Sequence, residues 1–251
     1  MERLDGKVAV VTGASRGIGR CVAERLAALG ASVVVNYVSR AAAAEEVAAA
    51  IRERGGQAIA VKADVSNAAE AEALVAETVR VFGGLHILVN NAGITRDRLI
   101  LRMAEEDWDA VLDTNLKGAF LCTKAALRPM MRHRWGRIVN IASIAWMIGN
   151  PGQANYTAAK AALVALTRTT AVEMASRGIT VNAVAPGYVV TEMTAHIEES
   201  RTGEALKRIP VGRAGSGDDI ATAVAFFASE AAAYVTGQVL NVDGGLTVAL
   251  G

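Results

Sequence analysis

The stretch VAVVTGASRGIG, residues 8–19, decides the fold of this chain. Its first four residues form an apolar run that is typical of a buried parallel strand. Gly13, Gly17 and Gly19 follow, between this strand and a helical pattern. A merely tight turn would explain one glycine. Three of them let the backbone approach a pyrophosphate, to which the next helix presents N–H groups and positive potential. The spacing differs from Gly-x-Gly-x-x-Gly, but the physics is the same and predicts dinucleotide binding.

Apolar runs and helical patterns alternate along the rest of the chain. The expected strands are residues 8–11, 32–37, 58–62, 87–89, 137–142, 180–185 and 239–242. Six helices are expected between them, including a long one near 108–131 and one that carries Tyr156 and ends near Ser176. No linker or composition shift divides the chain. The pattern predicts an α/β fold: one doubly wound Rossmann domain over residues 1–251, with a mainly seven-stranded parallel sheet and helices on both faces.

The amino-acid composition argues against several classes of binding partner. The net charge is +1, from 26 Lys and Arg against 25 Asp and Glu, which argues against nucleic acid as the main partner. No apolar run has transmembrane length, and the N-terminus enters a strand without a signal peptide, so we expect a cytoplasmic protein without membrane contact. Cys21 and Cys122 lie in unrelated contexts, as suits a reducing compartment. The three histidines are isolated, so no metal site is expected.

The candidate chemistry lies in residues 140–160. Ser143 follows the strand at 137–142, at the carboxyl end where ligands bind in open α/β sheets. Tyr156 and Lys160 are four residues apart and share one helix face. A nearby cation favours the phenolate, so Lys160 is expected to lower the tyrosine pKa from about 10. Together the three side chains are suited to moving a proton to or from a carbonyl or alcohol oxygen.

The end of the second strand bears on the choice of cofactor. NAD sites usually carry an acid there, which binds the ribose hydroxyls and repels a phosphate. This chain has Asn36 and Tyr37 instead, and cations and a hydroxyl surround the position, from Arg16, Ser39 and Arg40. These groups favour NADP(H) over NAD. The alternative is that both arginines are solvated surface charges.

Several of these motifs together resemble the short-chain dehydrogenase/reductase family over the whole chain. They are Thr12–Gly19, Asn90–Gly93, Asn115, Ser143, Tyr156, Lys160 and Pro186-Gly187. Four further stretches resemble the β-ketoacyl-acyl-carrier-protein reductases of that family. They are Asn91–Asp97, Gly152–Tyr156, Ala175–Asn182 and Asn241–Gly245. Acetoacetyl-CoA reductases share several of these stretches.

The resemblance implies a role for each catalytic candidate. Tyr156 would protonate the ketone oxygen, Ser143 would hydrogen-bond it, Lys160 would hold the nicotinamide ribose, and Asn115 would fix a water joined to Lys160. Without the family, Asn115 would be taken for a helix residue bonded to backbone, and Asp64 for a helix cap. The expected cofactor contacts are Gly13, Ser15, Arg16, Gly17, Ile18, Gly19, Asn36, Ser39, Asp64, Val65, Asn91, Ala92, Gly93, Tyr156, Lys160, Pro186, Gly187, Val189 and Thr191.

The reaction expected from this resemblance is NADPH-dependent reduction of a β-ketoacyl thioester on acyl carrier protein. Alternatives are the same chemistry on a CoA thioester, another short-chain alcohol or ketone substrate, and a non-catalytic dinucleotide sensor. A sensor need not retain all four catalytic candidates. Residues 191–211 are expected to form a substrate lid or a plain surface hairpin. Trp146, Met147, Tyr188 and Met193 would either wall an acyl pocket or simply pack.

Two further expectations concern assembly. The helical segments 116–131 and 158–174 are apolar over much of their circumference, which predicts a second buried face and hence an oligomer. The resemblance implies a homotetramer. It also implies that arginines at Arg134 and Arg177 bind the acidic carrier protein. The alternative for these two is a solvated loop with a helix-terminal arginine.

Overall fold

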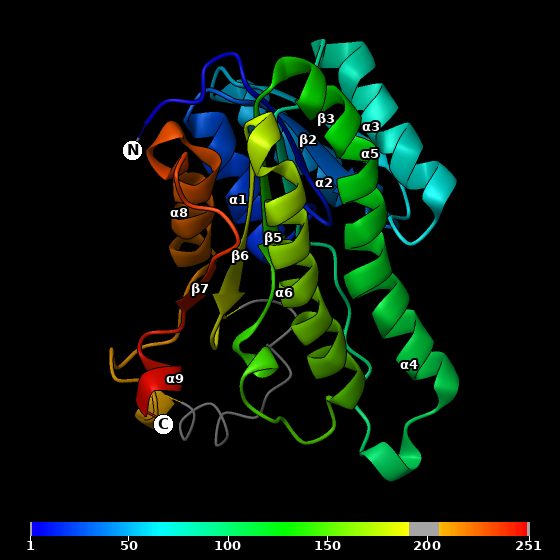
Figure 1. The fold of residues 1–251 in the computed structure, drawn as a ribbon, viewed down its shortest axis with the longest axis vertical. Helices are drawn as coiled ribbons and strands as arrows, with labels where there is room; N and C mark the ends of the chain where they lie inside the picture. Colours follow the sequence, from blue (N-terminus) through cyan, green and yellow to red (C-terminus); the bar gives the residue numbers. More distant parts are fainter. Residues whose placement is uncertain (1, 191–205, 250–251) are drawn as a thin grey trace.

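The computed structural model describes residues 2–190 and 206–249. They contain a seven-stranded parallel sheet (Figure 1), in the order β3-β2-β1-β4-β5-β6-β7. The strands are β1 Val8–Val11, β2 Ser32–Tyr37, β3 Gln57–Lys62, β4 Ile87–Asn90, β5 Gly136–Ile141, β6 Ile179–Pro186 and β7 Val239–Val242. The predicted fold class is therefore confirmed. The direction of winding changes between β1 and β4, and ligands of such sheets bind at this switch point, beyond the carboxyl ends of the strands.

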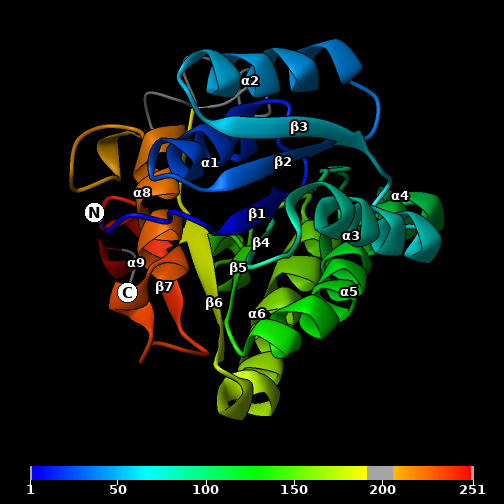
Figure 2. The ribbon, with the colours of Figure 1, turned by 90° about the horizontal axis from the view of Figure 1, so that it is seen from above.

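Helices cover both faces of the sheet (Figure 2). They are α1 Gly17–Ala28, α2 Ala41–Glu53, α3 Ala68–Phe82, α4 Glu105–Leu112, α5 Gly118–His133, α6 Ala154–Met174, α8 Gly217–Ala228 and the short α9 Leu246–Ala249. α1, α2 and α8 pack on one face, and α3, α5 and α6 on the other. Because both faces are covered, the central strands are buried throughout and read as continuous apolar runs.

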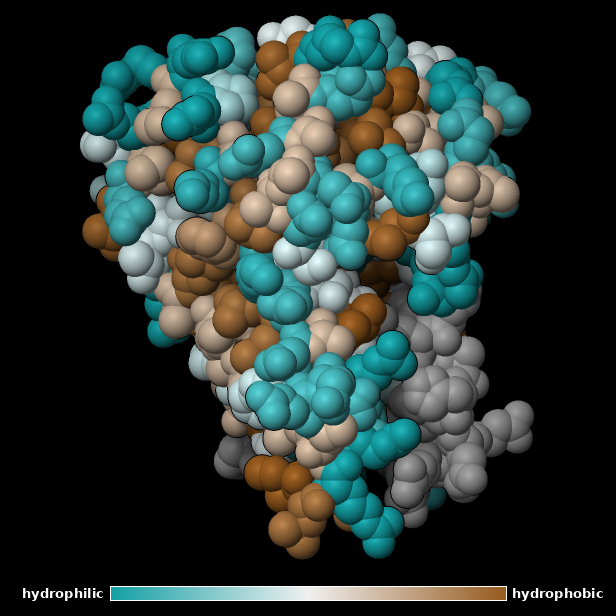
Figure 3. All heavy atoms as spheres, turned by 90° about the vertical axis from the view of Figure 1, so that its right-hand side faces the viewer, coloured by the Kyte–Doolittle hydropathy of each residue, from teal (hydrophilic) through white to brown (hydrophobic). Residues whose placement is uncertain are grey.

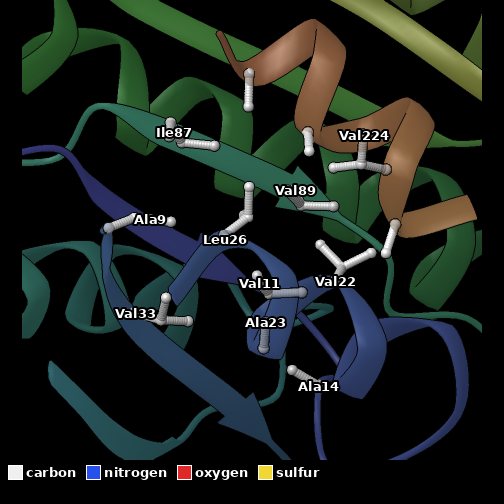
Figure 4. Close-up of a cluster of buried hydrophobic side chains, with 14 of the residues drawn as sticks. Ala9, Val11, Ala14, Val22, Ala23, Leu26, Val33, Ile87, Val89 and Val224 are labelled. Atoms are coloured by element: carbon white, nitrogen blue, oxygen red, sulfur yellow. The ribbon is translucent and has the colours of Figure 1, made fainter. Parts of the chain in front are cut away.

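The core has two layers, set by the alternation of side chains along each strand. Val11 of β1 points to one face, where it joins Val22 and Leu26 of α1 and Val224 of α8 (Figure 4). Val10 points to the other face, into a cluster with residues of α3 and α5. All five side chains are fully buried. This packing fixes the positions of the strand ends, and the site lies at these ends.

The long helix expected near residues 108–131 is interrupted. A π-helical segment, Asp113–Lys117, separates α4 from α5, and the N–H of Gly118 donates to the carbonyl oxygen of Asp113, five residues back. Single π turns are frequent at functional sites because they re-aim one side chain. Here the segment carries Asn115, whose side chain is buried.

The expected lid falls mostly outside the described part of the chain. Of residues 191–211, only 206–211 are described, and Thr191 and Met193 are not. The other expected boundaries agree with the structure to within about two residues, as helix ends usually do.

Candidate active site

A cleft opens at the carboxyl ends of the strands, with about 1340 Å³ of atom-free space including its mouth. Most of the expected site residues line it. They are Gly13, Ser15, Arg16, Gly17, Ile18, Gly19, Ser39, Asn91, Ala92, Gly93, Ser143, Tyr156, Lys160, Pro186, Gly187 and Val189. Four expected residues do not line it: Asn36, Asp64, Val65 and Asn115. Arg40, expected near a 2′-phosphate, lines the cleft as well. Six further lining residues were not predicted as contacts: Tyr37, Val38, Ile94, Thr114, Ile141 and Ala142.

The glycine loop leaves room for a bound group at the start of α1. Gly13 and Gly17 adopt positive φ angles of 62° and 55°, which favour glycine. A Cβ at Gly19 would lie 2.5 Å from Nδ2 of Asn91, so no other residue fits there without a shift. α1 has no side-chain cap and no acidic residue in its first turn. Its N–H groups and the positive end of its dipole therefore suit a diphosphate.

Asn36 supports this loop from beneath. Its side chain is 1% exposed, its Oδ1 accepts from the N–H of Gly13 at 3.1 Å, and its Nδ2 donates to the carbonyl oxygens of Val61 and Ala63. The amide is fully occupied by backbone partners. The expected cofactor contact of Asn36 is thereby replaced by a structural contact, and Tyr37, Val38, Ser39 and Arg40 face the cleft instead.

Asp64 and Val65 lie behind the cleft wall. Oδ1 of Asp64 accepts from the backbone N–H and the hydroxyl of Ser66. The cap of α3 is Asn67, whose side chain accepts from two N–H groups of the first turn, so the capping role considered for Asp64 belongs to Asn67. Val65 is buried against Gly118. That Asp64 and Val65 lie beside the adenine of a bound cofactor stays a prediction.

The second wall of the cleft begins after β4. Nδ2 of Asn91 donates to the carbonyl oxygens of Thr12 and Gly13, at 2.8 and 3.1 Å. The hydroxyl of Thr12 accepts from the N–H groups of Asn91 and Ala92, both at 2.9 Å. These bonds tie the glycine loop to the neighbouring strand end. The role of Thr12 in joining these two segments was not predicted, because its partners lie about 80 positions away in the sequence.

The three catalytic candidates meet at the far end of the cleft. Ser143 stands two residues beyond β5 in extended conformation, and its side chain caps the 3-10 turn Ile144–Trp146. Its hydroxyl also interacts with the phenol of Tyr156. Lys160 lies one helical turn beyond Tyr156, with Nζ 5.5 Å from the centroid of the tyrosine ring and 2.7 Å from the carbonyl oxygen of Ile141, to which it donates. The arrangement brings two hydroxyls and an ammonium to the same end of the cleft.

The pKa of Tyr156 differs from the expectation. Burial raises it, the hydrogen bond with Ser143 opposes that rise, and the charge of Asp97 adds to it. The ammonium of Lys160 is directed at Ile141 rather than at the phenol oxygen, so in this structure it does not lower the tyrosine pKa. Burial also lowers the pKa of Lys160 to about 8. At neutral pH the pair is therefore a neutral phenol and a mostly charged ammonium, which suits Tyr156 to donating a proton.

Asn115 braces the cleft wall from the π-helical segment. Its Oδ1 accepts from the N–H of Ile94 at 2.8 Å, and its Nδ2 donates to the carbonyl oxygen of the same residue at 3.0 Å. It thus bonds to backbone, which was the plain alternative to the role implied by the family. A water between Asn115 and Lys160 stays a prediction.

A family model described as enoyl-(acyl carrier protein) reductase matches residues 13–247. A 3-oxoacyl-[acyl-carrier-protein] reductase of Synechocystis is 53% identical over 249 residues, covering 99% of this chain and all of that protein. The chain belongs to the short-chain dehydrogenase/reductase family. A Staphylococcus aureus 3-oxoacyl-[acyl-carrier-protein] reductase is 50% identical, covering 96% of this chain and 98% of that one. A solved Sinorhizobium meliloti structure of the short-chain alcohol dehydrogenase type has a TM-score of 0.94 at 40% identity, with 98% of both chains covered.

Membership of the family brings a nicotinamide dinucleotide as the cofactor. The cleft fits such a group: its glycine loop admits a diphosphate, and no Asp or Glu is found among the described residues that line it. Within residues 2–190 and 206–249, no three His, Cys, Asp or Glu side chains are grouped as a metal site. No described helix is long and apolar enough to cross a membrane.

The two arginines of the expected carrier patch lie away from the cleft. Arg134 ends α5 and Arg177 belongs to the short turn after α6, and both are exposed. Their loops touch, as expected: a Cβ at Gly178 would lie 2.3 Å from the carbonyl oxygen of Arg134. Arg134 has a φ of +49° and is the one non-glycine residue with positive φ in the described chain.

Proposed function

We propose that this protein reduces a 3-oxoacyl thioester on acyl carrier protein to the 3-hydroxyacyl thioester, with NADPH, as a single-domain enzyme of fatty-acid biosynthesis. One observation carries the proposal: Ser143, Tyr156 and Lys160 line one cleft with the glycine loop, in a chain about half identical, over nearly its full length, to 3-oxoacyl-[acyl-carrier-protein] reductases. The description of the family model names a different reaction, the reduction of an enoyl group. The relatives are matched over nearly their full length and share half their residues with this chain, so their activity is the more specific guide.

The residues of the chain account for the proton and for the orientation of the substrate. When bound, the dinucleotide would supply the hydride for the carbonyl carbon. Tyr156 donates its phenolic proton to the carbonyl oxygen as the C–O double bond becomes single. The hydroxyl of Ser143 hydrogen-bonds the same oxygen and stabilises its developing negative charge. Lys160, which lines the same cleft one helical turn beyond Tyr156, would hold the nicotinamide ribose.

Preference for NADPH over NADH is proposed from the charges at the adenosine end. Arg16 and Arg40 both line the cleft beside Ser39, and the described lining holds no carboxylate to repel a phosphate. An arginine recognises a phosphate through a planar fork of donors. This set supports a 2′-phosphate more than it supports a bare ribose.

Docking of the carrier protein is proposed at Arg134 and Arg177. The left-handed conformation of Arg134 is costly for any residue but Gly or Asn, so a side chain retained there points to a use of its charge. Carrier proteins are acidic, and complementary charge mainly raises the rate of encounter and sets the choice of partner. The two cysteines are free thiols, and we propose a cytoplasmic location on that ground.

An oligomer is proposed from apolar side chains that this chain leaves exposed, and the family resemblance supplies the number four. Figure 3 shows apolar atoms among polar ones on the side where α3, α4 and α5 lie, with an apolar group at the lower end. Phe120 of α5 is 45% exposed and Val172 of α6 is 82% exposed, while Leu99, Ile100 and Leu101 stand out beside α4. Light scattering at micromolar concentration should give four times 26.1 kDa, and a mass of about 26 kDa would refute the proposal.

The reaction is tested by comparing acetoacetyl and crotonyl thioesters, each on acyl carrier protein and on CoA, with NADPH and with NADH. We expect the highest kcat/KM for the carrier-linked acetoacetyl group with NADPH. Faster reduction of the crotonyl group would show an enoyl reductase. Equal rates on CoA and carrier would remove the carrier from the proposal, and no turnover despite tight dinucleotide binding would favour a sensor.

A further inference from the structure

Asn155 precedes Tyr156 in α6 and is fully buried. Both N–H groups and the oxygen of its amide are bonded to backbone. Its Nδ2 donates to the carbonyl oxygens of Arg96 and Asp107, each at 3.1 Å, and its Oδ1 accepts from the N–H of Tyr156 at 2.7 Å. Asn155 does not line the cleft, so it does not meet the substrate. Anything that it does for the reaction is done through these three partners.

The three partners belong to three different segments of the site. Tyr156 lies in the first turn of α6, where N–H groups have no partner inside the helix, and Gln153 offers no side-chain cap. Arg96 lies in the segment after β4, close to Ile94 of the cleft wall. Asp107 lies in α4, which leads directly into the π-helical segment. One buried amide therefore joins the helix of the proton donor to the cleft wall and to the helix before Asn115.

The side-chain amide of Asn115 is bonded to the same cleft wall. Asn115 holds both backbone groups of Ile94, and Asn155 holds the carbonyl of Arg96 two residues later. The wall segment from Ile94 to Arg96 is thus hydrogen-bonded both to the π-helical segment and to α6. A proton donor has to lie about 2.6–3.2 Å from its acceptor, and a displacement of ~1 Å lowers rates by about 10²-fold.

We propose that Asn155 is a positioning residue for the reaction, which fixes Tyr156 relative to the cleft wall at Ile94 and to the helix that carries Asn115. The kinetic part of the inference rests on the proposed function. Its structural part does not, because the environment of the Tyr156 phenol can be measured without a substrate.

Asn182 provides a matched control. It is also a buried amide with backbone partners: its Nδ2 donates to the carbonyl oxygen of Val235 at 2.8 Å, and its Oδ1 accepts from the N–H of Gln238 at 3.0 Å. It is 1% exposed, lies in the middle of β6 and does not line the cleft. Asn155→Leu and Asn182→Leu remove the same group from the same kind of environment, so both should lower the urea midpoint of unfolding.

The two variants should differ in catalysis. We expect kcat of Asn155→Leu to fall about 10- to 100-fold, with the dinucleotide Kd within about twofold of wild type, and kcat of Asn182→Leu to stay within about twofold. The absorbance of the phenolate, taken as the difference between each protein and its Tyr156→Phe version, reports the tyrosine directly. In Asn155→Leu its titration should move toward the ordinary value near 10 as water reaches the phenol, and in Asn182→Leu it should not move.

Equal kcat for the two variants, with the same tyrosine titration in both, would overturn the inference. If the wild-type enzyme does not reduce 3-oxoacyl thioesters, the proposed function fails, and the phenolate comparison alone still decides the place of Asn155. If Asn155→Leu does not fold, Asn155→Ser replaces it, since its hydroxyl keeps part of the bonding, and the same two outcomes apply.

Discussion

Replacing Asn36 by aspartate distinguishes two roles for this position. The sequence predicts a role in the choice of cofactor, and the structure shows a role in supporting the glycine loop. From its place at the end of β2, an acid there should repel a 2′-phosphate and turn the enzyme toward NADH. The structure leads to a different result, because the side chain is 1% exposed and does not reach the cleft. Asn36→Asp keeps the acceptor for the N–H of Gly13. It removes both donations, to the carbonyl oxygens of Val61 and Ala63, and sets a carboxylate against them.

The expected cost is large for one substitution. Two buried carbonyl oxygens each lose a donor, at about 1–3 kcal/mol apiece, and a buried charge without a counter-ion costs about 3–5 kcal/mol. These costs overlap, because protonating the acid removes the charge and restores one donor. We therefore expect the free energy of unfolding to fall by roughly 3–5 kcal/mol at pH 8, out of the 5–15 kcal/mol typical of a folded domain.

The assay is urea unfolding of wild type and Asn36→Asp at pH 8 and at pH 5. Burial raises the pKa of a carboxyl group above its unfolded value near 3.9, so the folded variant binds more protons than the unfolded one between those two pKa values. The loss should therefore be smaller at pH 5 than at pH 8. A loss below ~1 kcal/mol at both pH values, with an altered cofactor preference, would refute the structural role of Asn36.

Val38→Asp is the matching control for cofactor choice. Val38 lines the cleft beside Ser39 and Arg40 and is 47% exposed, so a carboxylate there remains hydrated. It should leave the unfolding free energy within about 0.5 kcal/mol of wild type. Repulsion of a 2′-phosphate in a partly solvated site is worth about 1–2 kcal/mol, which lowers the NADPH/NADH ratio of kcat/KM roughly 5- to 30-fold. An unchanged ratio would place the discriminating contacts elsewhere.

Three other outcomes are expected. Tyr156→Phe should lower kcat by at least 10²-fold and leave dinucleotide binding nearly unchanged, and retention of more than a tenth of wild-type activity would remove Tyr156 from the mechanism. Arg134→Glu with Arg177→Glu should raise KM for the carrier-linked substrate and weaken its salt dependence, while CoA-linked turnover stays near wild type; equal losses on both would point to damaged folding. Burial, a neighbouring histidine and a neighbouring lysine lower the pKa of His86 to about 4. Since the unfolded state takes up that proton first, about 1–2 kcal/mol of stability should be lost as the pH falls from 6.5 to 4, and a His86→Gln variant should lose less over that range, as measured by urea unfolding.

The sequence predicted the fold well because the patterns that determine it are local. Strand runs such as 8–11 and 33–35 are apolar throughout because both faces of the sheet are covered, and the glycines mark the first turn. The break between α4 and α5 could not be predicted. A π turn shifts the hydrogen bonding by one residue without interrupting the apolar pattern, so residues 108–131 resemble one continuous helix.

In the candidate site, residue identity was predictable and side-chain direction was not. Tyr156, Lys160 and Ser143 follow from spacing and from their position at a strand end, and the structure brings them together. Asn36 occupies the expected position on its strand, but its amide is bonded to backbone and does not line the cleft. The sequence identifies Asn155 only as part of a motif, because its partners, Arg96 and Asp107, lie 59 and 48 positions away.

The carrier patch and the oligomer form one proposal in physical terms. Arg134 precedes β5 and Ser143 follows it, and a six-residue strand at ~3.3 Å per residue puts about 20 Å of sheet between them. A carrier protein bound at this patch therefore stands at the wrong end of the sheet for the cleft of the same subunit. The exposed apolar residues of α5 and α6 offer the remedy, because a second subunit packed on them can bring its own cleft toward this end. In an isolated subunit the two arginines lie far from the cleft, so the proposed docking at Arg134 and Arg177 requires the proposed assembly.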